Sequence, residues 1–371
     1  MRFLFAGGGT AGHINPALAL ANLICAKDKE AEICFVGTSE GMETSLVPAA
    51  GYPLKLIRVH GFDRSITLKN FKNLAELPVA IAAAKKIIKD FRPDAVIGTG
   101  GYVCGPVLYA AAQKKIPTLV HESNALPGIT TKLLSGFVDT VALGVEDAKA
   151  HLPHAKHCLV TGTPIRPALL ECDSFEARRK LGLDSRPFLV FFGGSLGARD
   201  FNKTVVDWIS QIAKERTYQV MMGTGKNQQY QTVMERFYTN GIRLEEYPQI
   251  QVCEYIYDMH IVMQAADVVI SRAGASTLCE LTALGKASVL VPSPYVTDNH
   301  QEHNARAMER GGGARVILEK EFTPQTLNET IKAMTGQPQT LARMKQNAAA
   351  MGHIDATETL YQEVLRLIAE K

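Results

Sequence analysis

Short apolar runs alternate along this chain with longer segments in which apolar residues recur at helical spacing. This alternation is typical of parallel βαβ units, whose strands are buried and whose helices cover the sheet. In the first half the apolar runs predict strands at 2–6, 31–36, 54–59, 95–97, 118–120 and 140–143. In the second half they predict strands at 188–192, 219–222, 251–254, 268–270, 288–291 and 315–318.

Two prolines interrupt this pattern within the segment Gly-Thr-Pro-Ile-Arg-Pro at 162–167. Proline is excluded from helix interiors and central strands, so we place the crossing between two domains there. The length of 371 residues also exceeds what one hydrophobic core organises. We therefore predict an α/β protein with two Rossmann-like, doubly wound domains over 1–163 and 164–354, which enclose a ligand cleft. A closing helix follows over 355–371, and its pattern does not indicate which domain it packs against.

Each domain opens with a strand that runs into a glycine-rich loop and then a helix. The loops are Gly-Gly-Gly-Thr-Ala-Gly at 7–12 and Gly-Gly-Ser-Leu-Gly-Ala at 193–198. Glycine allows the sharp turn and the close approach of backbone N–H groups that a diphosphate needs at a helix start. The first loop also matches the G-x-G-x-x-G dinucleotide fingerprint, but no acidic residue follows Val36 to hold a ribose. A nicotinamide dehydrogenase is therefore disfavoured.

Composition and charge argue against several classes of protein and of site. A net charge of +3 is too small for a nucleic-acid binder to depend on. The seven cysteines form no C-x-x-C pair, which argues against a disulfide framework or a zinc site and favours the reducing cytoplasm. With no leader and no apolar run near twenty residues, we expect a chain that is neither exported nor membrane-spanning. The absence of an Asp-x-Asp motif leads us to expect neither a bound metal nor a cofactor.

The strongest chemical motif is Ser-Arg-Ala-Gly-Ala-Ser-Thr-Leu-Cys-Glu at 271–280, which follows a strand and opens a helix. Its small residues would let a diphosphate approach the helix N–H groups, with the Ser276 and Thr277 hydroxyls as further donors. Glu280, one turn beyond Thr277, could accept hydrogen bonds from both ribose hydroxyls. The alternative is a capping box in which Thr277 and Glu280 only stabilise the helix start.

Three further groups follow strands of the first half. His13 comes directly after the first glycine loop and could act as a general base, or it could only hydrogen-bond the loop. His-Glu-Ser-Asn at 121–124 and Gly-Thr-Gly-Gly-Tyr at 98–102 follow two other strands. Polar residues at the carboxyl ends of parallel strands line the ligand crevice of such sheets. His121 could equally be a buried structural histidine.

Seven segments in register along nearly the whole chain resemble the MurG family of UDP-N-acetylglucosamine transferases. They begin at Gly8, Gly100, His121, Gly162, Gly193 and Gly274, and at Asp298 with Asp-Asn-His-Gln-Glu-His-Asn-Ala. The resemblance implies a GT-B fold and an inverting transfer of GlcNAc from UDP-GlcNAc. The implied acceptor is the MurNAc 4-hydroxyl of undecaprenyl-pyrophosphoryl-MurNAc-pentapeptide (lipid I), which becomes lipid II for peptidoglycan.

The same resemblance implies a set of site residues, with the donor bound mainly by the second domain. For the implied transfer we hypothesise that His13 is the base, with Glu122 as the alternative. The substrate-binding residues are Thr10, Ala11, Gly12, Tyr102, Asn124, Arg166, Ser195, Ile256, Ala275, Ser276, Thr277, Leu278, Glu280, Gln301 and Asn304. Ile256 would meet the uracil through its backbone, Glu280 the ribose, Ser195 and 275–277 the diphosphate, and Gln301 the sugar. Ala11 stands where the family commonly has glycine, so we expect a backbone angle there that alanine tolerates.

The stretch 55–92 has nine Lys or Arg against three Asp or Glu. Phe71, Leu74, Leu77, Val79 and Ile81 alternate there with Lys69, Lys72, Lys85, Lys86 and Lys89. Together with the implied acceptor, this predicts peripheral binding to anionic lipid on the cytoplasmic face of the cell membrane. The alternative is an ordinary amphipathic helix that packs on its own sheet. Other proteins of cell-wall synthesis and division are possible partners.

Two other readings of the chain stay open at this point. It could be another GT-B enzyme, such as a UDP-GlcNAc 2-epimerase or a lipid galactosyltransferase. It could also be a nucleotide-sugar binding protein without catalytic activity. A product assay separates these alternatives, because only the transferase forms a disaccharide from UDP-GlcNAc and a lipid acceptor.

Overall fold

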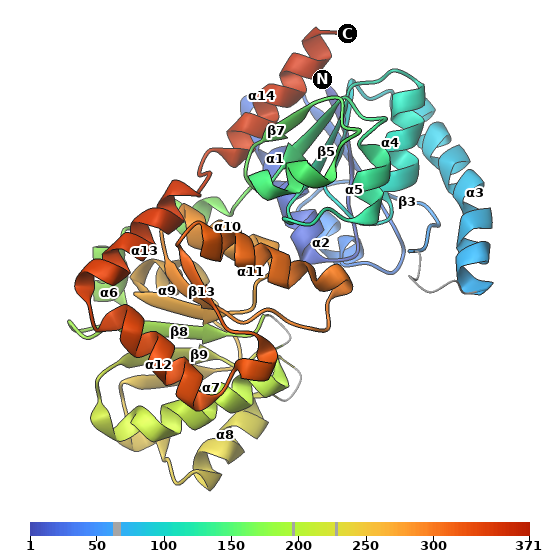
Figure 1. Ribbon diagram of the computed structural model, residues 1–371. Coiled ribbons are helices and arrows are strands. Elements are labelled where there is room, and N and C mark those ends of the chain that lie inside the picture. The colour runs from blue at the N-terminus through green and yellow to red at the C-terminus, as the bar shows by residue number, and fades with distance from the viewer. Residues whose placement is uncertain (62–67, 195–196, 227–228) are drawn as a thin grey trace. The chain divides into compact units, whose positions relative to one another are not determined.

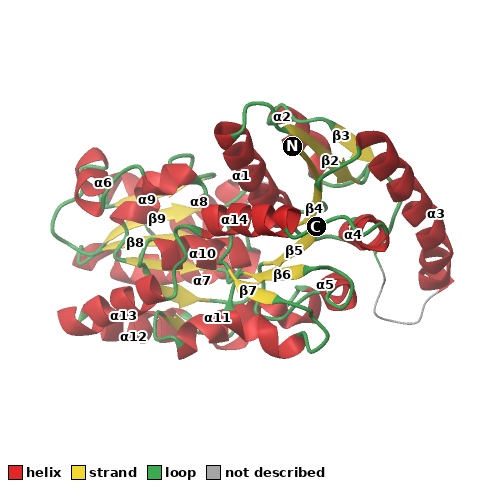
Figure 2. Ribbon diagram, turned by 90° about the horizontal axis from the view of Figure 1, so that it is seen from above, coloured by secondary structure: helices red, strands yellow, loops and turns green. Residues whose placement is uncertain are grey.

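Two compact units make up the computed structural model, which describes residues 1–61, 68–194, 197–226 and 229–371, without the side chains of 68–75. The first unit contains Met1–Ile165 and His353–Lys371, and the second contains Arg166–Gly352. Each unit has one parallel sheet with helices beside it (Figures 1 and 2). The chain thus leaves the first unit once, forms the second, and returns.

The first sheet has the strand order β3-β2-β1-β4-β5-β6-β7, and every neighbouring pair is parallel. Its strands are β1 (Arg2–Ala6), β2 (Glu32–Gly37), β3 (Leu54–Leu56), β4 (Ala95–Gly98), β5 (Thr118–Glu122), β6 (Thr140–Leu143) and β7 (Cys158–Val160). Its helices are α1 (Ala11–Lys27), α2 (Glu43–Ala49), α3 (Leu68–Phe91), α4 (Cys104–Gln113), α5 (Ile129–Leu134) and α14 (Ala356–Ala369).

Alternate side chains of β1 enter two different hydrophobic cores. Phe3 and Phe5 pack with residues of α1, α2 and α14, whereas Leu4 and Ala6 pack with residues of α3, α4 and α5. Successive side chains of a strand point to opposite faces, so a strand that is apolar throughout needs cover on both. This confirms the doubly wound arrangement.

The second sheet repeats this design with the order β10-β9-β8-β11-β12-β13, again parallel throughout. Its strands are β8 (Phe188–Phe192), β9 (Gln219–Gly223), β10 (Ile250–Cys253), β11 (Val268–Ser271), β12 (Ala287–Leu290) and β13 (Ala314–Val316). Its helices are α6 (Ser174–Lys180), α7 (Arg199–Ile212), α8 (Gln229–Thr239), α9 (Met259–Ala265), α10 (Ala275–Ala283), α11 (His300–Arg310), α12 (Pro324–Thr335) and α13 (Pro338–Ala350).

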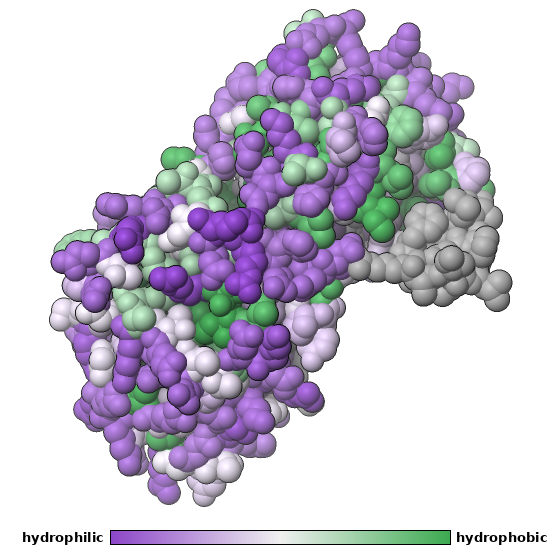
Figure 3. All heavy atoms as spheres, viewed as in Figure 1, coloured by the Kyte–Doolittle hydropathy of each residue, from purple (hydrophilic) through white to green (hydrophobic). Residues whose placement is uncertain are grey.

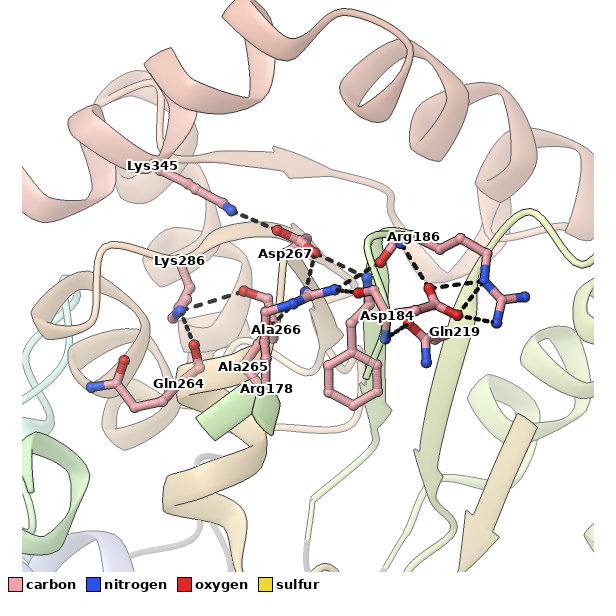
Figure 4. Close-up of polar contacts among 11 residues, drawn as sticks. Arg178, Asp184, Arg186, Gln219, Gln264, Ala265, Ala266, Asp267, Lys286 and Lys345 are labelled. Carbon is pink, nitrogen blue, oxygen red and sulfur yellow. Dashed lines mark hydrogen bonds and ion pairs between the residues drawn. The ribbon is translucent and has the colours of Figure 1, made fainter. Parts of the chain in front are cut away.

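A polar network fixes the amino ends of β8, β11 and β12 (Figure 4). The Asp267 carboxylate, just before β11, accepts hydrogen bonds from Arg178 at 2.8 Å, from Lys345 at 2.9 Å and from the Phe188 N–H at 3.0 Å. Lys286, just before β12, donates to the Gln264 carbonyl at 2.6 Å. Ligands of such sheets bind at the carboxyl ends of the strands. This network lies at the opposite ends, so its role is to stabilise the fold.

The final helix α14 packs against α1 in the first unit (Figure 1). Leu360, Val364 and Leu367 enter the core that α1 forms with β1, and the Thr140 hydroxyl donates to the Glu363 carboxylate at 2.5 Å. The helix therefore completes the first unit, which answers the question that its sequence pattern left open.

Candidate active site

In the first unit, two glycine loops pack against each other where the strand order reverses, between β1 and β4. The Gly8 N–H donates to the Gly100 carbonyl at 3.3 Å. Gly101 has a φ of +86°, and a Cβ there would lie 2.5 Å from the Gly8 carbonyl oxygen. Only glycine allows both the backbone angle and this contact. The loops at 7–12 and 98–102 therefore meet at the switch point, where open parallel sheets bind their ligands.

His13 is the third residue of α1 and is half-buried beside the first loop. Its Nδ1 lies 2.9 Å from the Gly8 carbonyl oxygen. Since a carbonyl oxygen can only accept, Nδ1 must carry the hydrogen, and the neutral ring then has its lone pair on Nε2. Gly100 leaves room for the ring, because a Cβ there would lie 2.4 Å from the His13 Cδ2. This is the tautomer that a base acting through Nε2 requires.

Glu43, at the start of α2, is a buried residue that the motif analysis missed. Its Oε2 accepts from the Gly9 N–H at 2.8 Å, and its Oε1 accepts from the Thr38 N–H and the Thr38 hydroxyl, each at 2.8 Å. Burial opposes ionisation, yet the hydrogen bonds from the Thr38 and Gly9 backbones hold the pKa of the Glu43 carboxyl below its usual range. A carboxylate thus lies beneath the first glycine loop.

The other residues predicted on this loop lie close to His13 in sequence. Thr10 is the N-cap of α1, and Ala11 and Gly12 form its first turn. Ala11 has a helical backbone, which confirms that alanine is tolerated there. The N–H groups of Gly8 and Gly9 are engaged within the protein, so a phosphate contact of this loop would use the groups that follow Thr10. Tyr102, in the other loop, is 58% exposed.

Strand β5 extends to Glu122, so His121 and Glu122 lie within the strand. The sequence pattern had placed both residues after its end. His121 is buried, and its Nε2 lies 3.0 Å from the Gly162 carbonyl oxygen. Burial lowers the pKa of His121, against the opposing effect of this hydrogen bond. His121 is therefore a structural histidine.

The Glu122 carboxylate is surrounded by donors. Oε1 accepts from the N–H and the side-chain amide of Asn124 at 3.1 and 3.0 Å, and Oε2 accepts from the Gly128 N–H at 3.0 Å and the Thr131 hydroxyl at 2.7 Å. These four hydrogen bonds engage both oxygens of the carboxylate. Asn124, predicted to bind the donor, contributes two of these hydrogen bonds.

In the second unit, a pocket lies at the carboxyl ends of the strands. It is lined by Arg166, Phe192, Gly194, Gly223, Gly225, Glu254, Tyr255, Ile256, Met259, Thr277 and Glu280. Four of the predicted donor-site residues are among them: Arg166, Ile256, Thr277 and Glu280. The Ile256 side chain is buried and approaches Gly223, where a Cβ would lie 3.1 Å from its Cδ1.

Arg166 and Glu280 form an ion pair in this pocket. The Arg166 Nε and Nη2 donate to Oε1 of Glu280 at 3.2 and 3.0 Å, so Oε2 is the oxygen on which a ribose hydroxyl could bind. Burial raises the pKa of Glu280, and the neighbouring Arg166 counteracts part of that rise. The arginine therefore favours the ionised carboxylate, which is the stronger hydrogen-bond acceptor.

Helix α10 begins at Ala275, with Gly274 as its N-cap and no side chain that caps it. The capping box between Thr277 and Glu280 is therefore wrong, because the helix starts earlier and Glu280 pairs with Arg166. Ala275 and Ser276 form the first turn, whose N–H groups have no intrahelical partner. Leu278 is 7% exposed, and its N–H donates to the Gly274 carbonyl at 3.1 Å.

Two predicted residues support loops beside this helix. The Gln301 side-chain carbonyl accepts from the Ser293 N–H at 2.9 Å, which leaves its NH₂ group to meet a sugar hydroxyl. Asn304 is 3% exposed and donates to the Ala273 carbonyl at 3.3 Å, just before α10. Neither residue lines the pocket. Ser195 lies outside the described residues.

None of the seven cysteines forms a disulfide bond. Within residues 1–61, 68–194, 197–226 and 229–371, no group of three or more His, Cys, Asp or Glu side chains is arranged to hold a metal ion.

Two doubly wound parallel-sheet units, with a polar pocket at the carboxyl ends of the second sheet, define the GT-B fold class. Comparison with known families places the family 28 glycosyltransferase N-terminal domain at residues 3–143 and its C-terminal domain at residues 188–360. The chain therefore belongs to glycosyltransferase family 28.

Two curated relatives carry the name UDP-N-acetylglucosamine–N-acetylmuramyl-(pentapeptide) pyrophosphoryl-undecaprenol N-acetylglucosamine transferase. The protein from Thermoanaerobacter sp. (strain X514) is 47% identical over 363 residues, 98% of each chain. That from Acetivibrio thermocellus is 45% identical over 372 residues, 100% of this chain and 99% of its own. The crystal structure of Acinetobacter baumannii MurG matches with a TM-score of 0.80 at 26% identity, over 98% of this chain and 99% of its own.

More distant structures share the fold alone. A UDP-GlcNAc 2-epimerase from Neisseria meningitidis has a TM-score of 0.67 at 16% identity, over 99% of this chain and 100% of its own. The epimerase alternative therefore has no support beyond a shared architecture.

Proposed function

We propose that this protein transfers GlcNAc from UDP-GlcNAc to the 4-hydroxyl of MurNAc in undecaprenyl-pyrophosphoryl-MurNAc-pentapeptide, with inversion at the anomeric carbon. The observation that carries this conclusion is 47% identity over 98% of the chain to a transferase named for this reaction. The pocket that holds Arg166, Ile256, Thr277 and Glu280 together supports it. A nucleotide-sugar donor needs a ribose acceptor beside a helix start, and this pocket has both.

The donor roles within this proposal follow the contacts in the second unit. Glu280 binds the ribose hydroxyls through the carboxylate that Arg166 holds, and the backbone of Ile256 meets the uracil. The first turn of α10 and Ser195 bind the diphosphate, where the positive end of the helix dipole stabilises the departing UDP. Gln301 meets the sugar.

His13 is the base in this proposal. It removes the proton from the acceptor hydroxyl while that oxygen attacks the anomeric carbon and the bond to the UDP oxygen breaks. Its tautomer supports this role, since Nδ1 donates to the Gly8 carbonyl and Nε2 can accept. Glu122 is the weaker candidate because its two oxygens already accept four hydrogen bonds.

The test is UDP release from UDP-GlcNAc with and without a lipid I analogue, followed by isolation of the product. We expect release that depends on the acceptor and a product that carries a β-1,4-linked GlcNAc. Release without acceptor, with formation of a 2-epimer, would identify an epimerase. Donor binding without turnover would identify a binding protein, and transfer from UDP-galactose would identify a galactosyltransferase.

The protein further binds the cytoplasmic face of the cell membrane through the first unit, where anionic lipid attracts its lysines. Among the described residues no helix is both long and apolar enough to span a bilayer. Ile129 and Leu133 on α5 and Phe137 just after it are 50%, 67% and 50% exposed, beside the exposed Lys132. Figure 3 shows hydrophobic side chains at the surface in this part of the unit.

The described side chains of helix α3 divide between a packed face and an exposed face. It packs on α4, which packs on α5, and Ile81 contacts the core, as expected for an amphipathic helix on its own sheet. Val79 is 67% exposed, and Lys85, Lys86 and Lys89 are exposed. The side chains of Lys69, Phe71, Lys72 and Leu74 lie outside the described residues.

A vesicle assay tests the lipid contact. Leu133→Glu combined with Lys132→Glu should weaken sedimentation with vesicles of phosphatidylglycerol and phosphatidylcholine at least tenfold, since each basic residue at such a surface contributes about 1 kcal/mol. Phe175→Glu is the control, because Phe175 is an 80% exposed aromatic residue of the second unit. Binding equal to wild type in the double variant would refute the proposed surface.

A further inference from the structure

One peptide group, between Gly8 and Gly9, is hydrogen-bonded at both ends. Its N–H, from Gly9, donates to Oε2 of Glu43 at 2.8 Å. Its C=O, from Gly8, accepts from Nδ1 of His13 at 2.9 Å. A buried carboxylate and the imidazole are therefore joined through a single peptide dipole.

The glycines around Glu43 show that this arrangement is built into the fold. A Cβ at Gly8, Gly37 or Gly41 would lie within 2.4, 2.5 or 1.9 Å of the Glu43 side chain. Thr38 holds the other carboxylate oxygen with its N–H and its hydroxyl. Glu43 itself is 0% exposed, so neither substrate nor solvent competes for its oxygens.

Such a chain of hydrogen bonds affects the imidazole in two ways. A carboxylate that accepts from a peptide N–H polarises that peptide, so its carbonyl becomes a stronger acceptor. The Gly8 carbonyl then holds the hydrogen on Nδ1 of His13, keeps the lone pair on Nε2, and stabilises the positive charge that arises when Nε2 takes a proton.

We propose that Glu43 is a positioning residue that sets the tautomer and basicity of His13 through the Gly8–Gly9 peptide. The inference rests on the proposed function in so far as His13 is the base. In the transfer step, the acceptor O–H proton passes to Nε2 while the new C–O bond forms. The electron pair of the broken C–O bond leaves with UDP, and Glu43 stays ionised throughout.

Glu43→Gln is the first test, because an amide offers one acceptor oxygen where the carboxylate offers two. We expect kcat to fall about 10- to 100-fold while the KM for UDP-GlcNAc stays within twofold. The ¹⁵N signals of His13, assigned by their loss in His13→Ala, should shift from the Nδ1–H form toward the Nε2–H form. Thr38→Val is the matched control, since it removes one donor to the same carboxylate and leaves the Gly9 contact in place. It should retain the wild-type tautomer.

A double-mutant cycle separates this role from a merely structural one. In the His13→Ala background, Glu43→Gln should cause no further loss of kcat. An equal loss in both backgrounds, or an unchanged Nδ1–H signal, would overturn the proposal. Wild-type turnover by His13→Ala would instead refute His13 as the base, and the tautomer measurement would still decide whether Glu43 controls the ring.

Should Glu43→Gln fail to fold, Glu43→Asp takes its place. This variant keeps the charge and shortens the reach by one methylene, so the Gly9 hydrogen bond lengthens. A folded Glu43→Asp protein should show the same two changes at smaller size, and wild-type values for both would overturn the proposal.

Discussion

The ionisation of the Glu280 carboxylate depends on its neighbour Arg166. Burial raises its pKa and Arg166 counteracts part of this rise, so Arg166→Met should raise the pKa of Glu280 further. The ribose then loses an ionised acceptor at a higher pH than in the wild type. As the pH is lowered, the KM of Arg166→Met for UDP-GlcNAc should therefore begin to increase at a higher pH than the wild-type KM does.

Glu280→Gln tests the same ribose contact with a side chain that does not titrate. Hydrogen bonds to a charged acceptor contribute about 1.5–3 kcal/mol, so its KM for UDP-GlcNAc should lie roughly 10- to 100-fold above that of the wild type with ionised Glu280, and it should not change with pH. Donor analogues with a 2′-deoxyribose serve as the control, since they should bind poorly to the wild type and equally to both forms of residue 280. A variant that still discriminates against the deoxy analogue would show that the ribose is bound elsewhere.

Some site residues could be predicted from the sequence and others could not. His13 and Glu280 follow strand–loop–helix patterns, and such patterns fix the positions of a few successive residues. Glu43 contacts Gly9 across 34 residues, a pairing that no local pattern contains. The roles of Glu122 and Asn304 were also beyond prediction, because a polar residue after a strand can face either a ligand or a neighbouring loop.

At the level of the elements, Asp267 joins the amino ends of β8 and β11 to α6 and α13 (Figure 4). Burial opposes its ionisation, but the Lys345 hydrogen bond, the Phe188 N–H and the Arg178 charge hold the pKa of Asp267 below its usual range. Asp267→Asn leaves two cations without their partner, and we expect it to lower the free energy of unfolding by about 2 kcal/mol at pH 7.

The pH dependence of this loss follows from the sign of the shift. A carboxyl whose pKa is lower in the folded state stabilises the fold above its unfolded pKa of about 3.9, and this contribution disappears as the pH falls through the folded pKa. Denaturant titrations should therefore show a constant difference between wild type and Asp267→Asn above about pH 5, and a shrinking one below about pH 4. Glu176→Gln is the control, since it breaks an exposed pair with Lys180 and should leave the stability close to that of the wild type. A difference that does not shrink as the pH falls below about 4 would contradict the electrostatic explanation.

Most strands could be predicted because they are apolar runs buried on both faces. β7 was missed, since Cys158–Val160 is a half-buried edge strand of only three residues. The end of β5 was misplaced because His121 and Glu122 are polar yet buried in the strand, where hydrogen bonds satisfy them. The prediction ended the strand at these polar residues, because the sequence does not show the hydrogen-bond partners that allow them to be buried.

On the scale of the whole molecule, two sheets could be predicted from two rounds of strand–helix alternation. The return of the chain to the first unit could not. An amphipathic pattern shows that one face of α14 is buried, but it does not show in which of the two units. Only the contacts of Leu360, Val364 and Leu367 with the α1 side of the first core decide between them.

Because the second unit is inserted between β7 and α14, two covalent connections join it to the first, at 165–166 and 352–353. A protease that cuts the earlier connection leaves α14 attached to the second unit, and that helix remains seated among the side chains of α1. The two fragments would therefore stay associated as a nicked protein. They separate only when α14 leaves the hydrophobic core that it shares with α1.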